Sequence, residues 1–544
     1  MKKTLLFVFA LPTFALSSQS LVKDIYAGAG SSTPMIIASI GADKTFILAD
    51  DGTHGREIWI SDGTATGTKM LADINPAGSG AAYATTAIMN GKLYFPANDG
   101  TNGKELWVTD GTTPGTKMVK DHIPGAASGL SGSQFIVYKG RVYFQTFDMT
   151  NGQELSSSDG TDAGTGLVKD LTGNDNGSYP QNMVVFKNRL FFQALVPGYG
   201  MEWWSTDGSD TGTHLLADIN PGGGNGVSTN GYEYNGWLYF GGTSSIASGT
   251  ELWRTNGSTT EMLKNINTGA NASSNPSDFM KANGKLFFVA DDGNAGRELW
   301  LTDGTQAGTR MVHEINTGSS GTAMSLLGEL NNRLLFSATT SAYGNEIWST
   351  DGTDTGTHML QDLYVNSGAG VNSLNSEAYA KPASGFIVNP YIINGYYYFA
   401  GNDGVNGIEL WRTNGTISGT EMMAQICDAT CSAGITWIFA GAAKIWLAAT
   451  NGTTGSELYA YTLPDLAVHK TSGQPGITVY PNPAENYVSF SQPAAYVLSD
   501  FSGKILKKSA NPVNQIHLQD MPAGLYIALL KTESGIFNCK LMKK

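Results

Sequence analysis

The chain has 544 residues and a formal net charge of -13 at neutral pH. The repeated part of the sequence holds no run of basic residues, so nucleic acids and anionic membrane surfaces are unsuitable partners. Glycine is abundant at 68 residues, which indicates many turns between regular elements.

The N-terminal segment, residues 1–17, is predicted to be a secretory signal peptide. Two lysines precede an apolar core of about a dozen residues, which is too short to span a membrane. Small residues behind this core favour cleavage after Ser17. We therefore expect the mature protein to leave the cytoplasm.

Residues 21–463 carry one phrase, typified by "KELWVTDGTTPGT" at 104–116, in nine copies. The copies follow at a nearly constant interval, apart from one long insertion at roughly 364–386. Such a period indicates a modular array in which each unit buries its apolar face against its neighbours. The slot of Trp107 is filled in chain order by Trp59, Trp107, Ser156, Trp204, Trp253, Trp300, Trp348, Trp411 and Tyr459.

Each copy is predicted to form four short β-strands. In the second copy, Asn90-Gly91 separates two apolar runs and favours a type I′ hairpin turn, because both positions of that turn need positive φ. The phrase "DGTxxGT" after the third strand is a second turn signal. No helical periodicity appears in the repeats, which excludes an α-solenoid.

The two ends of the array favour a single closed β-propeller of about nine four-stranded blades. The ninth copy stops at 456–463 without a fourth strand, whereas "LVKDI" at 21–25 precedes the first copy and has no blade of its own. Pairing this N-terminal strand with the last three strands would close the ring. Two smaller rings are the alternative, because nine blades exceed the usual number.

The repeat resembles that of the bacterial ELWxxDGT-repeat proteins over residues 21–463. The resemblance is specific as a repeat signature, and the family brings no catalytic motif that could be transferred to this chain. The third copy departs most, with Ser156 in the aromatic slot, so we expect its blade to be the least tightly packed.

Two polar slots recur in the copies. One holds glutamate in all nine, which we interpret as a structural carboxylate at the head of the third strand, with ion binding as the alternative. The other holds Asp in most copies and Asn at 256 and 414, so an acceptor side chain suffices there. The glutamates are Glu57, Glu105, Glu154, Glu202, Glu251, Glu298, Glu346, Glu409 and Glu457.

Ring topology assigns two faces to the propeller. We define the varied face as the turns between second and third strands together with the crossovers between blades, where the sequence varies most and where we expect any ligand. Its "ADDG" carboxylate pairs are interpreted as turn formers, with calcium ligation or a glycosidase acid and nucleophile as alternatives. The candidate binding residues are Asp50, Asp51, Asp291, Asp292, Tyr364 and Tyr379.

Cys427 and Cys431 lie in a crossover of an exported protein, which favours a disulfide between them. Closing so short a loop would contribute about 2 kcal/mol by loop entropy. A zinc site is not expected, because a second pair of ligands is missing. No cofactor is expected, apart from the calcium alternative above.

A polar linker with Pro and Gly, residues 464–476, precedes a different domain at 477–544. Alternating strands and turns predict a small immunoglobulin-like β-sandwich there. Four blocks, from "ITVYPNPAENYVSF" to "CKLMKK", resemble the C-terminal sorting domain of the type IX secretion system. The resemblance implies export across the outer membrane of a Gram-negative bacterium, removal of the tail, and either release or attachment at the cell surface.

Two functional hypotheses remain open. The sequence contains no G-x-S-x-G elbow, H-E-x-x-H motif or phosphate loop, which favours a monomeric, non-enzymatic adhesion module that binds a glycan or a protein. The alternative is a secreted carbohydrate-active hydrolase or lyase that uses Asp and Glu side chains around the central channel.

Overall fold

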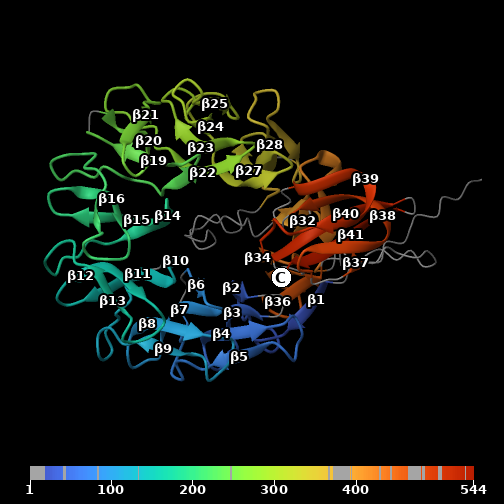
Figure 1. Cartoon of the computed structure of the whole chain (residues 1–544), viewed down its shortest axis with the longest axis horizontal. Helices are drawn as coiled ribbons and strands as arrows, with labels where there is room; N and C mark the ends of the chain where they lie inside the picture. The colour runs from blue at the N-terminus through green and yellow to red at the C-terminus, as the bar shows by residue number, and fades with distance from the viewer. Residues whose placement is uncertain are drawn as a thin grey trace, which may run out of the picture. The chain divides into compact units, whose positions relative to one another are not determined.

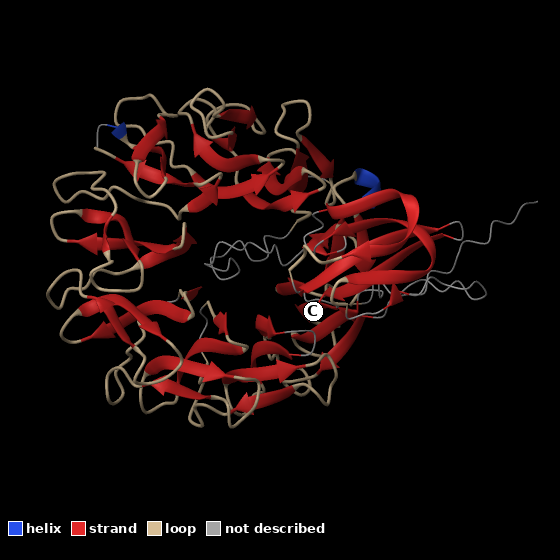
Figure 2. Cartoon of the chain, viewed as in Figure 1, coloured by secondary structure: helices blue, strands red, loops and turns tan. Residues whose placement is uncertain are grey.

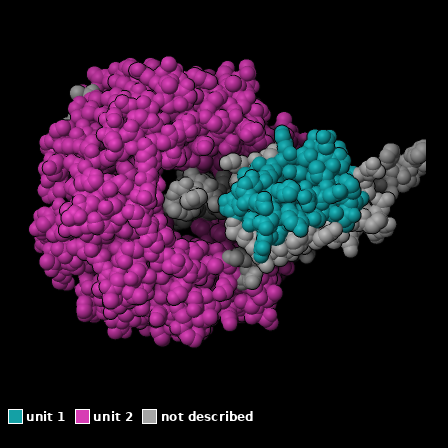
Figure 3. Space-filling view, in the orientation of Figure 1, with its two compact units in different colours: residues 1–18, 462–544 teal, residues 19–461 magenta. Residues whose placement is uncertain are grey.

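The computed structural model describes residues 19–40, 44–81, 85–132, 134–245, 248–365, 368–371, 392–393, 395–427, 431–440, 444–462, 479–480, 484–499, 505–522, 524–532 and 535–543. The chain divides into two compact units (Figure 3). We call Gln19–Tyr461 the repeat unit and Thr462–Lys544 the tail unit. Both are built from β-strands, turns and loops (Figure 2), with a short 3-10 turn, η2, at Ile417–Gly419.

The repeat unit consists of nine four-stranded antiparallel sheets, one for each predicted copy. The first three sheets are β2 (Met35–Ile40), β3 (Lys44–Asp50), β4 (Arg56–Ser61) and β5 (Lys69–Ala72); β6 (Ala87–Met89), β7 (Lys92–Asn98), β8 (Lys104–Thr109) and β9 (Lys117–Lys120); and β10 (Ile136–Tyr138), β11 (Arg141–Asp148), β12 (Gly152–Ser158) and β13 (Gly166–Lys169). The next three are β14 (Gln181–Phe186), β15 (Arg189–Val196), β16 (Gly200–Thr206) and β17 (His214–Leu215); β18 (Tyr232–Tyr234), β19 (Trp237–Thr243), β20 (Thr250–Thr255) and β21 (Thr260–Lys264); and β22 (Ser277–Ala282), β23 (Lys285–Asp291), β24 (Arg297–Thr302) and β25 (Arg310–His313). The last three are β26 (Met324–Leu330), β27 (Arg333–Thr340), β28 (Gly344–Thr350) and β29 (His358–Gln361); β30 (Ile392–Ile393), β31 (Tyr396–Asn402), β32 (Ile408–Thr413) and β33 (Glu421–Ala424); and β34 (Trp437–Ala440), β35 (Lys444–Ala449) and β36 (Glu457–Thr462) with β1 (Gln19–Lys23).

The ninth sheet joins the two ends of the repeat unit, in the order β1-β36-β35-β34. The predicted pairing of the N-terminal strand with the last three strands is therefore confirmed, with Leu21 opposite Tyr459. Strand β34 also lies against β31 on one side and β2 on the other. Figure 1 shows the sheets following one another around a common centre, with β1 beside β36.

The fourth strand of each sheet is shorter than the sequence pattern predicts. The prediction extended the N-terminal strand to Ile25, but β1 ends at Lys23. The reason is that the backbone N–H of Ile25 donates to the Glu457 carboxylate at 2.8 Å instead of to a neighbouring strand. Strand β5 likewise ends at Ala72, and the N–H of Ile74 donates to Glu57.

The hairpins between first and second strands have the predicted backbone. Asn90 and Gly91 have φ values of 52° and 71°, and Asn235 and Gly236 have 50° and 76°. Both residues are in the left-handed region that a type I′ turn requires. Asn394, which belongs to the same prediction, lies outside the described residues.

The core of the repeat unit lies between successive sheets. Trp59 is 6% exposed and packs with Val22 of β1 and with Ile25, which follows that strand, whereas Trp107 packs with Ile74, which follows β5. In the sheets that carry the tryptophan, its indole thus fills the gap to the preceding sheet, where a large rigid apolar side chain buries the most area. This contact is the stacking that the repeat period predicted.

The tail unit contains one five-stranded sheet, and this differs from the predicted sandwich of two sheets. Its long strand β38 changes partner along its length: its first half pairs with β37, and its second half pairs with β40. The register between β38 and β39 is irregular after Ser489, which lets the sheet bend. The bent sheet encloses its own apolar core, so a second sheet is not needed to cover it. The strands are β37 (Val479–Tyr480), β38 (Tyr487–Ser499), β39 (Ile505–His517), β40 (Gly524–Thr532) and β41 (Gly535–Lys543).

Candidate functional site

Each sheet of the repeat unit buries one glutamate near the start of its third strand, and all nine side chains are at most 1% exposed. In the fifth sheet, Glu251 Oε2 accepts the N–H of Ile266 at 2.6 Å and the hydroxyl of Ser274 at 2.7 Å. Its Oε1 accepts the N–H of Ser274 at 3.0 Å. All these donors lie on the crossover to the next sheet. The glutamate therefore holds the crossover in place, and the structural interpretation of this slot is confirmed.

Burial changes the acidity of these glutamates. It raises the pKa of Glu57 and Glu346 to about 7 and that of Glu202 to about 8, although backbone N–H groups oppose the shift. The cause is the loss of hydration, which penalises the charged form. These groups carry protons at a higher pH in the folded chain than in the unfolded one.

The recurring Asp or Asn after the third strand builds a turn. Asp62 Oδ1 accepts the N–H of Thr64 at 2.8 Å and its hydroxyl at 2.7 Å, and these bonds lower the pKa of Asp62. Asn414 accepts from Thr416 in the same way, at 3.0 Å. An acceptor side chain is thus sufficient at this slot, as the sequence predicted. We call the turns of this slot, together with the hairpins between first and second strands, the DGT face.

The candidate carboxylate pairs on the varied face accept hydrogen bonds from the backbone of the turns in which they lie. Asp50 accepts the N–H of Gly52 at 2.7 Å, and Asp51 accepts that of Thr53 at 2.9 Å. Asp291 and Asp292 bind the backbone of their turn in the same way, at 2.7 and 2.9 Å. The two pairs are not brought together, because Figure 1 places β3 and β23, the strands that lead into them, on opposite sides of the repeat unit.

The structure does not assemble a metal site from these side chains. Across the described ranges, no group of three or more His, Cys, Asp or Glu residues is placed to hold a metal ion. His54 Nδ1 lies 2.8 Å from Asp51 Oδ2, so that carboxylate is already engaged within its turn.

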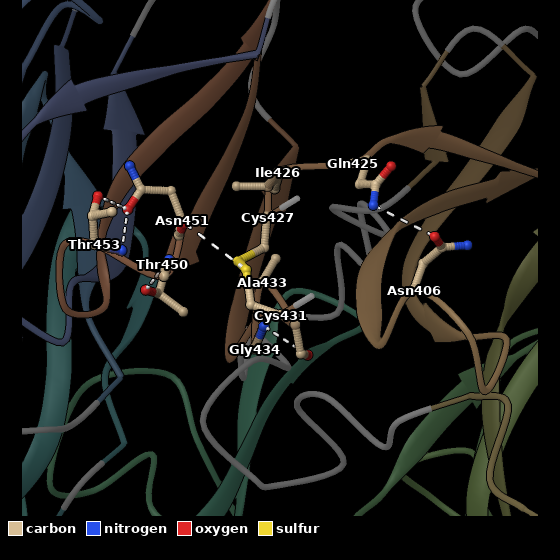
Figure 4. The surroundings of a disulfide bond; sticks show 12 residues. Asn406, Gln425, Ile426, Cys427, Cys431, Ala433, Gly434, Thr450, Asn451 and Thr453 are labelled. Atoms are coloured by element: carbon tan, nitrogen blue, oxygen red, sulfur yellow. Dashed lines mark hydrogen bonds between the residues drawn. A yellow bond between two sulfur atoms is a disulfide. The ribbon is translucent and has the colours of Figure 1, made fainter. Parts of the chain in front are cut away.

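Cys427 and Cys431 form a disulfide in the crossover that precedes the ninth sheet (Figure 4). Both sulfur atoms pack against Gly452, where an added Cβ would lie 3.0 Å from one and 3.2 Å from the other. In the preceding crossover the Tyr364 ring covers Gly404 in the same way, at 2.6 Å from such a Cβ. The disulfide and the tyrosine therefore fill equivalent places between a crossover and the next turn.

Two other candidates lie outside the described residues, namely Tyr379 and Ser17. Tyr364 lies on the varied face, as expected, and is 37% exposed although part of its ring covers Gly404.

The third sheet replaces the usual tryptophan contact by a polar one. Ser156 is 1% exposed, and its Oγ lies 2.7 Å from Thr146 Oγ1. On the preceding crossover, His122 stands where the other copies have Ile or Leu, and its Nδ1 lies 2.9 Å from Glu105 Oε2. The His122 ring meets Phe144, the cross-strand neighbour of Ser156, edge-on at 6.0 Å. Looser packing of this sheet stays a prediction.

Most of the exposed large apolar side chains in the described repeat unit belong to loops of the varied face, which the sequence did not reveal. Among the described residues of the repeat unit, eleven large apolar side chains are exposed, and seven of them belong to crossovers or to the turns between second and third strands. Ile417 is the exposed member on the DGT face. The seven are Met149, Tyr179, Tyr199, Tyr343, Tyr364, Val365 and Val405.

The tail unit indicates the localisation of the protein. Residues 478–544 match the family model of the secretion system C-terminal sorting domain. The chain is therefore exported through the type IX secretion machinery and lies outside the cell or on the outer surface of a Gram-negative bacterium. No helix of the described part is long and apolar enough to cross a membrane.

Three solved structures align with this chain at low sequence identity. No curated protein matches the chain. A solved structure of PorZ, an essential bacterial surface component of the type IX secretion system of Porphyromonas gingivalis, aligns over 93% of this chain and 74% of its own, with 12% identity and a TM-score of 0.30. A prolyl endopeptidase aligns over 62% and 50%, with 14% identity and a TM-score of 0.38. A puromycin-hydrolysing peptidase of Mycobacterium tuberculosis aligns over 63% and 53%, with 11% identity and a TM-score of 0.33. Likenesses this distant carry no argument about function.

Proposed function

We propose that the protein is a non-enzymatic adhesion module of the bacterial surface, whose varied face binds a glycan or a protein. The observation that carries this proposal is that seven of the eleven exposed large apolar side chains in the described repeat unit belong to loops of that face. Loops on a rigid scaffold are where proteins most often carry binding residues, and exposed apolar side chains there offer contact surface to a partner. The rigid strands behind them hold these loops in place for recognition.

The proposal includes a single closed ring of nine blades as the scaffold. Its support is a contact that recurs around the repeat unit, in which a hairpin lysine binds a backbone carbonyl of the next sheet. Lys44 Nζ donates to Asp110 at 3.1 Å, and Lys139 Nζ donates to Asp207 at 3.3 Å. The same contact joins the ninth sheet to the first, from Lys444 Nζ to Asp62 at 3.1 Å.

The proposal also includes a signal peptide at residues 1–17. The first strand begins at Gln19, so cleavage after Ser17 would leave the closing strand intact. N-terminal sequencing of the secreted protein tests this point.

Binding of the full chain to an array of glycans and surface proteins tests the function. The array is run with and without calcium, and its glycan spots are analysed for cleavage products. We expect selective retention that is weakened by Val405→Ser on the varied face and unchanged by Ile417→Ser on the DGT face. These two side chains are 79% and 65% exposed, so neither substitution disturbs the core. Equal loss in both variants contradicts the proposed face, and cleaved glycans would favour a hydrolase or lyase.

A further inference from the structure

The turn between second and third strands differs among the nine sheets at one position, three residues before the buried glutamate. In four sheets the side chain there is bonded to an aspartate of its own turn. Asn102 Nδ2 donates to Asp99 at 2.7 Å, and Asn406 Nδ2 donates to Asp403 at 2.6 Å. His54 and Asn151 make the corresponding contacts with Asp51 and Asp148. At this position a side chain normally stabilises the turn.

The fourth and seventh sheets lack this bond between a side chain and an aspartate of the turn. Their turns are "VPGYG" and "TSAYG", which contain no aspartate, and the position is filled by Tyr199 and Tyr343. The two residues are 41% and 44% exposed, although the Tyr199 ring also meets Trp204 edge-on at 6.5 Å. The glycine that follows each tyrosine has φ near 70°, so both turns end in the same backbone conformation. These tyrosines have no partner aspartate in the turn, and their exposure calls for another explanation.

The residues of the two turns that carry these tyrosines suit an uncharged ligand. Neither turn contains an ionisable residue other than the tyrosine itself. A tyrosine ring offers a flat apolar face and a hydroxyl at its rim, and its side chain loses little entropy on binding. Sugar rings present flat patches of C–H groups edged by hydroxyls, which this combination matches. An anionic ligand would instead require positive charge beside the ring.

The pair of sites also suits a repeating ligand. The tyrosines occupy the same slot of two different sheets on the varied face, so each can offer an aromatic ring to the same kind of ligand unit. A protein partner would need one continuous interface of about 1,000 Å² or more with an apolar core. A polysaccharide offers the same unit many times and can engage two small separate sites at once.

We infer that Tyr199 and Tyr343 are two equivalent stacking sites for sugar rings of a neutral polysaccharide. This inference rests on the proposed function and names the ligand class and the residues. Engagement of both sites by one chain makes binding of the polymer tighter than binding of a short fragment.

The test uses the full chain with uncharged glucans and mannans, each as a long polymer and as a short oligosaccharide. For the native protein, titration calorimetry with the matching oligosaccharide should give two sites per chain. Tyr199→Ser or Tyr343→Ser should each reduce this number to one and weaken polymer binding by on the order of 10²-fold. Tyr199→Phe keeps the ring and should retain both sites.

Ile417→Ser serves as the matched exposed control, and thermal melting verifies that every variant remains folded. Unchanged stoichiometry in the double serine variant would overturn the inference while leaving the proposed binding face in place. Failure of the native protein to retain any of these neutral polymers would also overturn it. In that case, a partner retained on the array and lost on Val405→Ser would show that the proposed function survives.

Discussion

Replacing Glu251 by alanine removes a buried acceptor that holds a crossover. Four donors lose this acceptor: the N–H groups of Ile266, Asn267 and Ser274 and the Ser274 hydroxyl, at 2.6, 3.3, 3.0 and 2.7 Å. The two Ser274 donors keep the backbone oxygen of Thr250, at 3.0 and 3.3 Å, whereas Ile266 and Asn267 are left without the carboxylate. Ser274 is fully buried, and Ile266 and Asn267 are 6% and 9% exposed, so water cannot easily replace the carboxylate. An unsatisfied buried donor costs about 1–3 kcal/mol. Allowing for relaxation of the crossover, we expect a total loss of about 3–5 kcal/mol.

Urea unfolding followed by tryptophan fluorescence measures this loss. Glu233→Ala in the same sheet is the control, because Glu233 is exposed and accepts one N–H, from Gly236 at 3.0 Å. That change should cost about 0.5–1 kcal/mol. Amide hydrogen exchange should rise in residues 266–275 of Glu251→Ala before it rises elsewhere. Equal stability of the two variants would refute the role of the glutamate as the residue that holds the crossover.

Three further outcomes follow from the same structure. Burial raises the pKa of Glu57 from 4.5 to about 7, so the folded chain binds more protons than the unfolded chain in this range. The free energy of unfolding should therefore fall as the pH rises from about 5 to about 8. Glu57→Gln should make this pH dependence less steep. A free energy of unfolding that rises over this range in the native protein would contradict the raised pKa of Glu57. Cys431→Ser should lower the free energy of unfolding by about 2 kcal/mol, and reductant should do the same to the native protein but not to the variant. Leu21→Pro removes a backbone donor from β1 opposite Tyr459, so the melting temperature should fall, and an unchanged value would argue against closure through this strand.

The repeat architecture could be predicted because its signals are local. Asn90-Gly91 specifies a turn by its own backbone preference, and Asp62 closes its turn through bonds to a residue two positions away. The ninefold recurrence of such signals also shows which strand is missing from the last copy. This is why the sequence alone predicts the pairing of β1 with β36.

The ends of the strands and the candidate site required the tertiary structure. The capture of the Ile25 N–H by Glu457 joins residues 432 positions apart, and no local pattern reveals that β1 stops at Lys23. The "ADDG" pairs resemble ligand-binding carboxylates in sequence, but Asp51 is engaged by its own turn.

The amino-acid sequence by itself determined the number of sheets, their hairpins, the closing strand and the export address, because each depends on contacts between residues near in the chain or on repetition. Only the tertiary structure decided which side chains are left exposed. Tyr199 and Trp204 are both aromatic residues of one hairpin, yet the first is 41% exposed and the second 7%. The preceding sheet covers the tryptophan. Whether a side chain is exposed therefore depends on residues that are distant in sequence and adjacent only in the folded chain.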